Sequence, residues 1–575
     1  MPINRYLLAA AGLTAVAMSS CVDDDYDLSD IDTTAKIQVS DLTLPVNIDP
    51  IKLSSMFDLG DDSKVKEVGG IYAVVEDGTF SSSEIKINRV NLRGVAGDQS
   101  TRHINLGAPL GPQPGITADV PVTSDPIGFS YSSSDVPAEI RSIKAAGGDF
   151  TLSLDIDFPE LNGKISKIAF KNLKIKLAKG FDAVSDRGTY DPASGIIDIP
   201  EATVAGATLT INLHGTALDF AMMGGTFDPA THSASVSSDI AVTEGEVVLD
   251  GADVISTIPA DISMVTSFKM SDIVLTWFSG RMAYDITGVN ISPVDLNDLP
   301  DILSQGDTRV SLVNPQIYLS ADNPLHSYGL RARTGLSITS VFKPEQGTPD
   351  HTASLDAPGY FEVSSAAVSS YVLSPEPPAS IQPGFAGATH VPFTALSGIL
   401  EGNGLPARLD IALDNPNVFE QDVERLQLGT PLGDVKGKYQ FFAPLQLGAN
   451  SQVVYTDTED GWNDEDVDAI TIEELKVAVT VSSDVPFALK FTGYPIDVKG
   501  NQINNVKIEG ADIPANADNV PVTIRISGAV THLDGIRFTA TGTVPDDMKQ
   551  PLSPSQTITV GDLRATVSGY YLKEL

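Results

Sequence analysis

The sequence predicts an all-β protein made of antiparallel sheets, with few and short helices. Three observations support this prediction. Apolar and polar residues alternate over many short segments, and the 48 Gly and 37 Pro of the 575 residues interrupt those segments at short intervals. Long segments with apolar residues at positions i, i+3, i+4 and i+7 are absent. We therefore expect several β-sandwich modules in tandem, or one elongated stack of sheets.

Residues 151–158 show the alternation most clearly, because every second residue is Leu, Ile or Phe. Residues 208–214, 408–414, 475–481 and 522–527 repeat the pattern. One apolar and one polar face per strand is typical of antiparallel sheets. Short helices are expected only around residues 53–59 and 299–304.

Proline follows several of the alternating runs. It occurs in Phe158-Pro159, Asn314-Pro315, Asn415-Pro416 and Val485-Pro486. Since Pro has no amide hydrogen to donate to a neighbouring strand, each pair is expected to end a strand. The intervals between the pairs are unequal, which argues against a solenoid with a fixed repeat.

The first twenty residues have the features of a signal peptide. Arg5 supplies a positive charge, Tyr6 to Met18 form a short apolar run, and Ser19 and Ser20 are the small residues that a signal peptidase needs. Cys21, the only cysteine of the chain, follows directly.

This arrangement resembles the lipobox of bacterial lipoproteins, although Met18 stands where Leu is more common. In that family the chain is cut before the Cys, which is then acylated. The resemblance implies that Cys21 is the lipid attachment site and that the lipid anchors the mature chain to a membrane without a transmembrane helix.

Asp23, Asp24 and Asp25 begin an acidic stretch that continues to Asp32 without a basic residue. The stretch resembles the export signal that follows the lipid-bearing Cys in surface-exposed lipoproteins of Bacteroides-type bacteria. The resemblance implies an outer-membrane lipoprotein exposed on the cell surface. The alternative is the periplasmic face, because like charges also keep a linker extended and away from an anionic membrane.

Turn and linker signals divide the chain into five segments. They are a signal peptide (1–20), an acidic tether and entry segment (21–65), and three β-rich segments (66–250, 251–390 and 391–575). The Pro-rich residues 374–379 are expected to be an internal linker, because Pro favours extended chain.

The composition excludes several classes of function. A net charge of -38 opposes binding to nucleic acid, which depends on Lys and Arg. A single Cys excludes a disulfide framework and a cysteine-based metal site. The seven His are dispersed, and no nucleophile or phosphate-binding motif is present. The sequence thus favours a non-catalytic protein without a cofactor, and a hydrolase whose site assembles from distant residues is the alternative.

One acidic segment near residue 460 has two interpretations. Its oxygen-bearing side chains can bind calcium, and the candidate ligands are Asp457, Glu459, Asp460, Asp464 and Asp466. The spacing of the helical calcium loop does not fit, so a solvated hairpin tip is the other interpretation. Trp462 lies in the same segment and can contact a sugar ring or a partner's pocket, or fold back on its own sheet.

These features favour a membrane-anchored lipoprotein of the cell envelope that acts as a surface binding, adhesion or scaffold module. Its expected partners are the membrane, through the N-terminal lipid, and a glycan or an envelope protein. The first alternative is an accessory protein for envelope transport or lipid carriage, and the second is a surface hydrolase.

Overall fold

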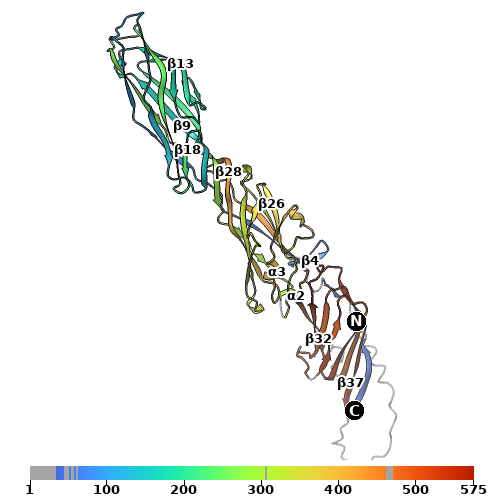
Figure 1. The fold of residues 1–575 in the computed structure, drawn as a ribbon. Helices are drawn as coiled ribbons and strands as arrows, with labels where there is room; N and C mark the ends of the chain where they lie inside the picture. The colour runs from blue at the N-terminus through green and yellow to red at the C-terminus, as the bar shows by residue number, and fades with distance from the viewer. Residues whose placement is uncertain are drawn as a thin grey trace, which may run out of the picture.

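The protein is a long rod of three β-rich units that follow one another along its axis (Figure 1). The computed structural model describes residues 34–44, 51–53, 57, 59, 63–304, 307–461, 470–504 and 506–574. The all-β class predicted from the sequence is confirmed, and among the described strand pairs only β26 and β27 run parallel. The predicted short helix near residue 300 is α2 (Asp301–Ser304), and the other short helices are α3 (Leu396–Ile399), η2 (Pro159–Leu161), η3 (His326–Tyr328), η4 (Pro344–Gln346) and η5 (Pro383–Phe385).

The distal unit contains residues 85–285 and the second half of strand β28. One layer is a nine-stranded sheet of β12 (Thr189–Asp191), β13 (Ile196–Ala205), β10 (Lys167–Lys176), β16 (Ser233–Asp250), β8 (Ile127–Ser133), β5 (Val90–Ala96), β18 (Ile273–Leu275), β7 (Thr117–Pro121) and β15 (Thr226–Asp228). The other layer is the distal part of an eleven-stranded sheet, with β11 (Phe181–Ser185), β14 (Thr208–Asp219), β9 (Ile140–Asp157), β19 (Trp277–Asp285), β17 (Asp261–Met270) and β6 (Ser100–Asn105).

The middle unit contains residues 63–82 and 290–447. It completes the eleven-stranded sheet with β28 (Arg408–Gln427), β23 (Ala332–Val341), β24 (His351–Ser354), β21 (Val294–Asp295) and β25 (Phe361–Val363). Against these strands packs a seven-stranded sheet of β20 (Asn290–Ile291), β4 (Ile71–Ser81), β29 (Lys436–Pro444), β22 (Gln316–Asp322), β26 (Val368–Ser374), β27 (Thr389–Pro392) and β3 (Val65–Val68).

The proximal unit contains residues 34–53 and 448–574. Its six-stranded sheet consists of β1 (Thr34–Leu44), β37 (Thr557–Glu574), β31 (Ile470–Ser483), β35 (Val520–Val530), β33 (Lys507–Glu509) and β2 (Ile51–Lys52). A four-stranded sheet faces it, with β30 (Ser451–Glu459), β36 (Gly535–Val544), β32 (Ala488–Ile496) and β34 (Ala511–Ile513).

The three units are nested in the sequence. The chain passes from the proximal unit through the middle unit to the distal unit, and then returns through the same two units. As a result, Thr34 at the start of β1 pairs with Glu574 at the end of β37. Both described ends of the chain therefore lie in the proximal unit, and the centre of the sequence builds the opposite end of the rod (Figure 1).

The predicted alternation of buried and exposed residues is confirmed where it was clearest. In β9 and the residue after it, Leu152, Leu154, Ile156 and Phe158 are fully buried. The same pattern occurs in β14 and in the first half of β28. The apolar faces form one core inside the distal unit and a second core that is shared by the middle and proximal units.

The prediction that Asn415-Pro416 ends a strand is wrong, because β28 continues through it from Arg408 to Gln427. Before the proline, β28 pairs mainly with β23 of the middle unit, and after it with β19 of the distal unit. Asn415 has a φ of 48°, in the left-handed region, so the strand bends where it changes partners. This strand joins the two units within one sheet.

The Pro-rich residues 374–379 do not link separate units. The segment leaves β26 at Ser374 and returns as β27, which pairs with β26 in the same sheet. On the way, Phe385 packs on Tyr318 with a ring-centroid distance of 5.3 Å. The segment therefore covers the outer face of the seven-stranded sheet, where Val75, Val372 and Phe442 are also buried.

Candidate binding surfaces at the tip and at the distal–middle junction

Most of the residues singled out in the sequence lie outside the described residues. These are Cys21, Asp23, Asp24, Asp25, Trp462, Asp464 and Asp466. Asp457 and Glu459 belong to the end of β30, and Asp460 is exposed just after it. The calcium site therefore stays a prediction. In the part of the chain that the structure describes, no three His, Asp, Glu or Cys side chains lie close enough together to hold a metal ion.

Four loops form the tip of the distal unit, at the far end from β1 and β37 (Figure 1). They comprise residues 106–116, 158–166, 205–207 and 251–260. Strand β9 runs toward them, since its first residue pairs with β19 near the middle unit and its last residue pairs with β14 and β17. Two bridges, Leu110 to Ile258 and Ile165 to Val254, tie the loops to one another.

The tip carries exposed aliphatic side chains on loops that are held by backbone hydrogen bonds. Ile116 is 46% exposed and Ile255 is 62% exposed. The amide of Gly251 donates to the carbonyl of Ile116 at 2.8 Å, and the amide of Ile255 donates to the carbonyl of Lys164 at 2.7 Å. Residues 106–116 include no charged residue, which is unusual in a chain of net charge -38. This one loop therefore offers a preformed, uncharged contact surface, within a tip whose other loops carry Glu160, Lys164 and Asp253.

Glu160 in η2 connects the loop of residues 158–166 to strand β17 by a hydrogen bond. Its carboxylate accepts a hydrogen bond from the backbone amide of Ser263 at 2.9 Å. Burial alone acts to raise the pKa of Glu160, but the hydrogen bonds from the backbone and side chain of Ser263 and the nearby His103 outweigh it. The net effect is a pKa below the usual value of a Glu carboxyl.

A hollow lies between the distal and middle units. Its cavity volume is about 60 Å³, which is room for a few water molecules. Its walls come from both cores: Leu325 and Val418 belong to the distal core, and Leu319 and Phe361 belong to the core of the middle unit. Because neither core closes over the other here, the space between them remains unfilled by side chains.

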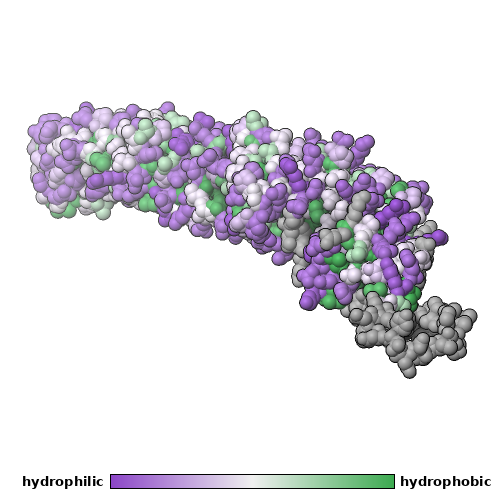
Figure 2. Space-filling model, turned by 90° about the horizontal axis from the view of Figure 1, so that it is seen from below, coloured by the Kyte–Doolittle hydropathy of each residue, from purple (hydrophilic) through white to green (hydrophobic). Residues whose placement is uncertain are grey.

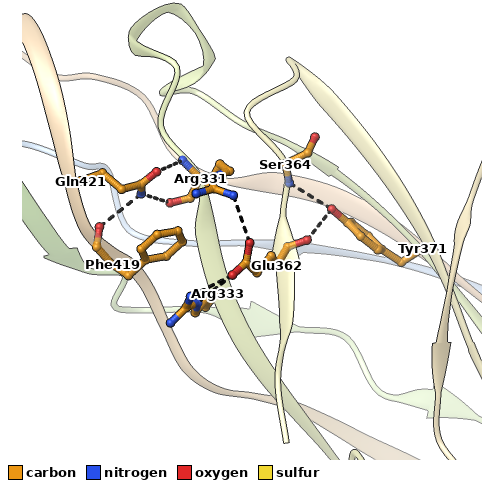
Figure 3. Close-up of polar contacts among 7 residues, drawn as sticks. All are labelled: Arg331, Arg333, Glu362, Ser364, Tyr371, Phe419 and Gln421. Carbon is orange, nitrogen blue, oxygen red and sulfur yellow. Dashed lines mark hydrogen bonds and ion pairs between the residues drawn. The ribbon is translucent and has the colours of Figure 1, made fainter. Parts of the chain in front are cut away.

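Arg331 and Arg333 belong to the lining of the hollow, and Glu362 of the neighbouring strand β25 forms ion pairs with both (Figure 3). Arg333 Nη2 and Nε donate to Glu362 Oε1 at 2.9 and 3.1 Å, and Arg331 Nη1 donates to Glu362 Oε2 at 3.3 Å. The guanidinium of Arg333 also lies 4.2 Å from the ring centroid of Phe419 and 4.9 Å from that of Tyr360. These contacts fix the direction of the Arg333 side chain.

Hydrogen bonds between side chains and the backbone hold the segments that carry these residues. The hydroxyl of Tyr371 donates to the carbonyl of Glu362 at 2.9 Å and accepts from the amide of Ser364 at 3.1 Å (Figure 3). On the other side, the amide nitrogen of Gln421 donates to the carbonyl of Arg331 at 2.7 Å. Both segments are therefore held in place by their own backbone partners.

Sequence reasoning did not identify Arg331, Arg333 or Glu362. They come together only because β23 pairs with β25, which places Arg333 opposite Glu362. A single Arg-x-Arg in a strand is a weak signal without knowledge of its neighbour. The tip loop at residues 106–116 carried a signal that was available, namely eleven residues with no charge and three prolines.

The sides of the rod differ from both sites. Seen from below, the surface is largely hydrophilic, with apolar residues in small separate groups (Figure 2). Individual exposed residues such as Val184, Val274 and Val498 are spread over the distal and proximal units. Scattered apolar residues of this kind are normal for a protein surface.

Comparisons with known proteins give little further information. No family model and no curated protein matches the chain. Among solved structures, the chain is similar to one described as "a putative secreted protein" from Parabacteroides distasonis, with 16% sequence identity and a TM-score of 0.38 over 51% of this chain and 89% of that chain. Within the described ranges, no helix is both long enough and apolar enough to cross a membrane. The evidence for function therefore comes from this chain's own sequence and geometry.

Proposed function

We propose that this chain is a lipid-anchored, non-catalytic binding rod of the bacterial outer membrane, which holds its tip loops away from the membrane to contact a partner. The observation that carries the proposal is the pairing of Thr34 with Glu574 at one end of the rod, with the tip loops at the other. Cys21 precedes Thr34 by thirteen residues, which span at most about 45 Å when fully extended. A lipid on Cys21 keeps the proximal unit near the membrane and directs the tip outward.

The chemistry of the tip favours a protein partner over a glycan. Recognition of sugars commonly uses an exposed aromatic ring, and the only aromatic residue in the four tip loops is Phe158, which is buried. Exposed Ile116, on a loop without charged residues, and exposed Ile255 are instead suited to a protein interface, whose core is depleted of charged residues.

Labelling of single cysteines on cells tests the anchor and the orientation. Ser256→Cys places a thiol at the tip, and Lys499→Cys places one on an exposed loop of the proximal unit as the matched control. We expect a membrane-impermeant maleimide to label Ser256→Cys on intact cells, and Cys21→Ser to release the chain from the membrane fraction. Labelling of Ser256→Cys only after the outer membrane is permeabilised would place the rod in the periplasm and contradict surface display.

The binding role of the tip is tested by photocrosslinking on intact cells. A photoreactive amino acid at position 255 is compared with the same residue at position 184, which is 74% exposed on β11 and away from the tip. We expect a discrete protein adduct from position 255 that is absent from position 184 and is lost with Ile116→Asp. The same adducts from both positions would contradict a specific role for the tip.

A further inference from the structure

We infer that the partner of the tip presents a groove lined with aromatic side chains, which receives Pro109 and Pro112 of the loop at residues 106–116. The inference rests on the function proposed for the tip and names the class of partner that the tip takes. Three properties of the loop carry it, namely the exposure of its prolines, its extended backbone and the carbonyl groups that it leaves free.

Prolines cover the outer side of this loop. Pro109, Pro112 and Pro114 are exposed, whereas Leu110 between the first two is only 8% exposed. A proline side chain is apolar, and its ring fixes the backbone angle φ. It therefore contributes apolar contact area and loses little conformational freedom when it binds.

Backbone hydrogen bonds hold the loop against the neighbouring tip loop of residues 251–260. The amide of Leu110 donates to the carbonyl of Ile258 at 3.0 Å, and the amide of Ile258 donates to the carbonyl of Leu110 at 2.9 Å. The amide of Gln113 donates to the carbonyl of Gly251 at 3.1 Å. These bonds fix residues 110 and 113 on the tip and leave the proline before each of them exposed to solvent.

The backbone between the prolines is extended. Gly107 and Gly115 have φ angles of 78° and 88°, and none of the residues between them, all of which the structure describes, has a positive φ or belongs to a helix. In an extended proline-type segment, three residues complete one turn and span about 9 Å. Residues three apart, such as Pro109 and Pro112, then lie on the same side.

The loop also leaves hydrogen-bond acceptors available to a partner. In the part of the chain that the structure describes, no group donates a hydrogen bond to the carbonyl oxygen of Pro109 or of Pro112. A Tyr hydroxyl or a Trp indole N–H can donate to such a carbonyl while its ring packs on the proline. Grooves lined with aromatic side chains recognise segments with two prolines three residues apart.

Photocrosslinking from position 255 on intact cells tests the inference, because this position is next to the proline-containing loop and not part of it. The full chain carries Pro109→Ala together with Pro112→Ala. The matched control is Pro229→Ala, which removes an exposed proline from the turn between β15 and β16 of the same unit. Mass spectrometry of the adduct locates the crosslinked segment of the partner.

A competition experiment isolates the loop from the rest of the tip. A synthetic peptide with the sequence of residues 106–116 is added to cells that carry the unchanged tip and the photoreactive residue at position 255. The same peptide with Pro109→Ala and Pro112→Ala is its matched control.

We expect the double proline variant to lower the yield of the adduct about tenfold, as the loss of a central contact does, and Pro229→Ala to leave the yield unchanged. The crosslinked segment of the partner should lie beside Trp or Tyr residues, and replacing these rings by Ala should remove the adduct. The unsubstituted peptide should lower the yield, and the substituted peptide should not.

The inference and the function proposed for the tip fail in different ways. An adduct that is lost with Ile116→Asp but keeps its yield in the double proline variant would overturn the inference alone, and so would a crosslinked segment without aromatic residues. No adduct from position 255 would contradict both. Thermal unfolding shows whether the double variant folds. If it does not fold, the peptides decide, and equal competition by the two peptides would overturn the inference.

Discussion

Trp277 in β19 lies directly over Gly147 in β9, its partner in the strand pairing, and the guanidinium of Arg425 stacks on the indole at 4.1 Å from the ring centroid. A side chain at position 147 would collide with the indole nitrogen and ring of Trp277. The glycine is therefore required by close approach and not by its backbone angles. The contact lies in the part of the sheet that joins the distal unit to β28.

The first prediction is that Gly147→Ala displaces Trp277 and destabilises the protein by about 1–3 kcal/mol, the usual cost of overpacking. Trp fluorescence in a Trp462→Phe background reports the displacement, and denaturant unfolding reports the stability. Gly128→Ala is the control, because a Cβ there meets nothing within 4 Å. Equal unfolding midpoints for the two variants would contradict the role assigned to Gly147.

The second prediction concerns Phe278, which is fully buried in the sheet that the distal and middle units share. Phe278→Ala should lower the free energy of unfolding by about 3–5 kcal/mol, because it removes a ring and leaves a cavity. Val274→Ala, at a position that is 44% exposed, should change it by less than about 0.5 kcal/mol. Similar losses in thermal or chemical unfolding would mean that the shared sheet tolerates the cavity.

The third prediction separates two kinds of contact around Glu362, its ion pairs and the hydrogen bonds of Tyr371. Glu362→Gln should cost less than about 1 kcal/mol, because the ion pairs with Arg331 and Arg333 are partly exposed. Tyr371→Phe should cost about 1–3 kcal/mol, because it removes a buried hydroxyl and leaves the Ser364 amide without that acceptor. Chemical denaturation measures both, and a larger loss for Glu362→Gln would reverse this ranking.

The fourth prediction is a dependence of the tip on pH. The pKa of Glu160 is lower in the folded protein than its usual value of 4.5, so the unfolded chain takes up this proton more readily. The stabilisation by Glu160 is complete above pH 4.5 and is lost as the pH falls through its folded pKa. The protection of the Ser263 amide, measured as its hydrogen-exchange rate relative to that of an unstructured amide at the same pH, should therefore decrease below pH 4.5.

Two variants check the assignment of this effect to Glu160. In Glu160→Gln, the Ser263 amide should exchange faster than in the unchanged protein already at pH 7. Its protection should not decrease further below pH 4.5. Glu84→Gln, at an exposed acid outside the tip, should behave as the unchanged protein. An acid-dependent step that persists in Glu160→Gln would mean that another group titrates.

The fold class and many strands could be predicted because a strand that is buried on one face shows alternating apolar and polar residues in its sequence. Leu209, Ile211 and Leu213 are buried as their spacing indicates, and so are Ile273 and Leu275 on either side of exposed Val274. Strand pairing leaves no comparable trace, because an alternating strand carries the same signal whichever neighbour it has. The nested order of the three units therefore could not be predicted from the sequence.

The behaviour of Pro416 shows the same limit at a single residue. The missing amide hydrogen of proline was interpreted as the end of a strand, whereas β28 continues and changes neighbours there. A proline marks a position that cannot donate a backbone hydrogen bond to a neighbouring strand. It does not indicate whether the strand continues beyond that position beside a different neighbour. The ion pairs of Glu362 were missed for a similar reason, since Arg333 and Glu362 meet only through the pairing of β23 with β25.

The pairing of β1 with β37 also sets a sequence of events during biogenesis. Among the described strands, β1 pairs only with β37, so the base cannot be completed before the chain as far as β37 has been made. The distal unit takes nearly all its strands from the centre of the sequence and can fold earlier. Contacts between such distant segments form slowly, and β1 stays an unsatisfied edge in the meantime. An envelope chaperone that shields this edge would serve the assembly of the rod at the step where it is most exposed to misassembly.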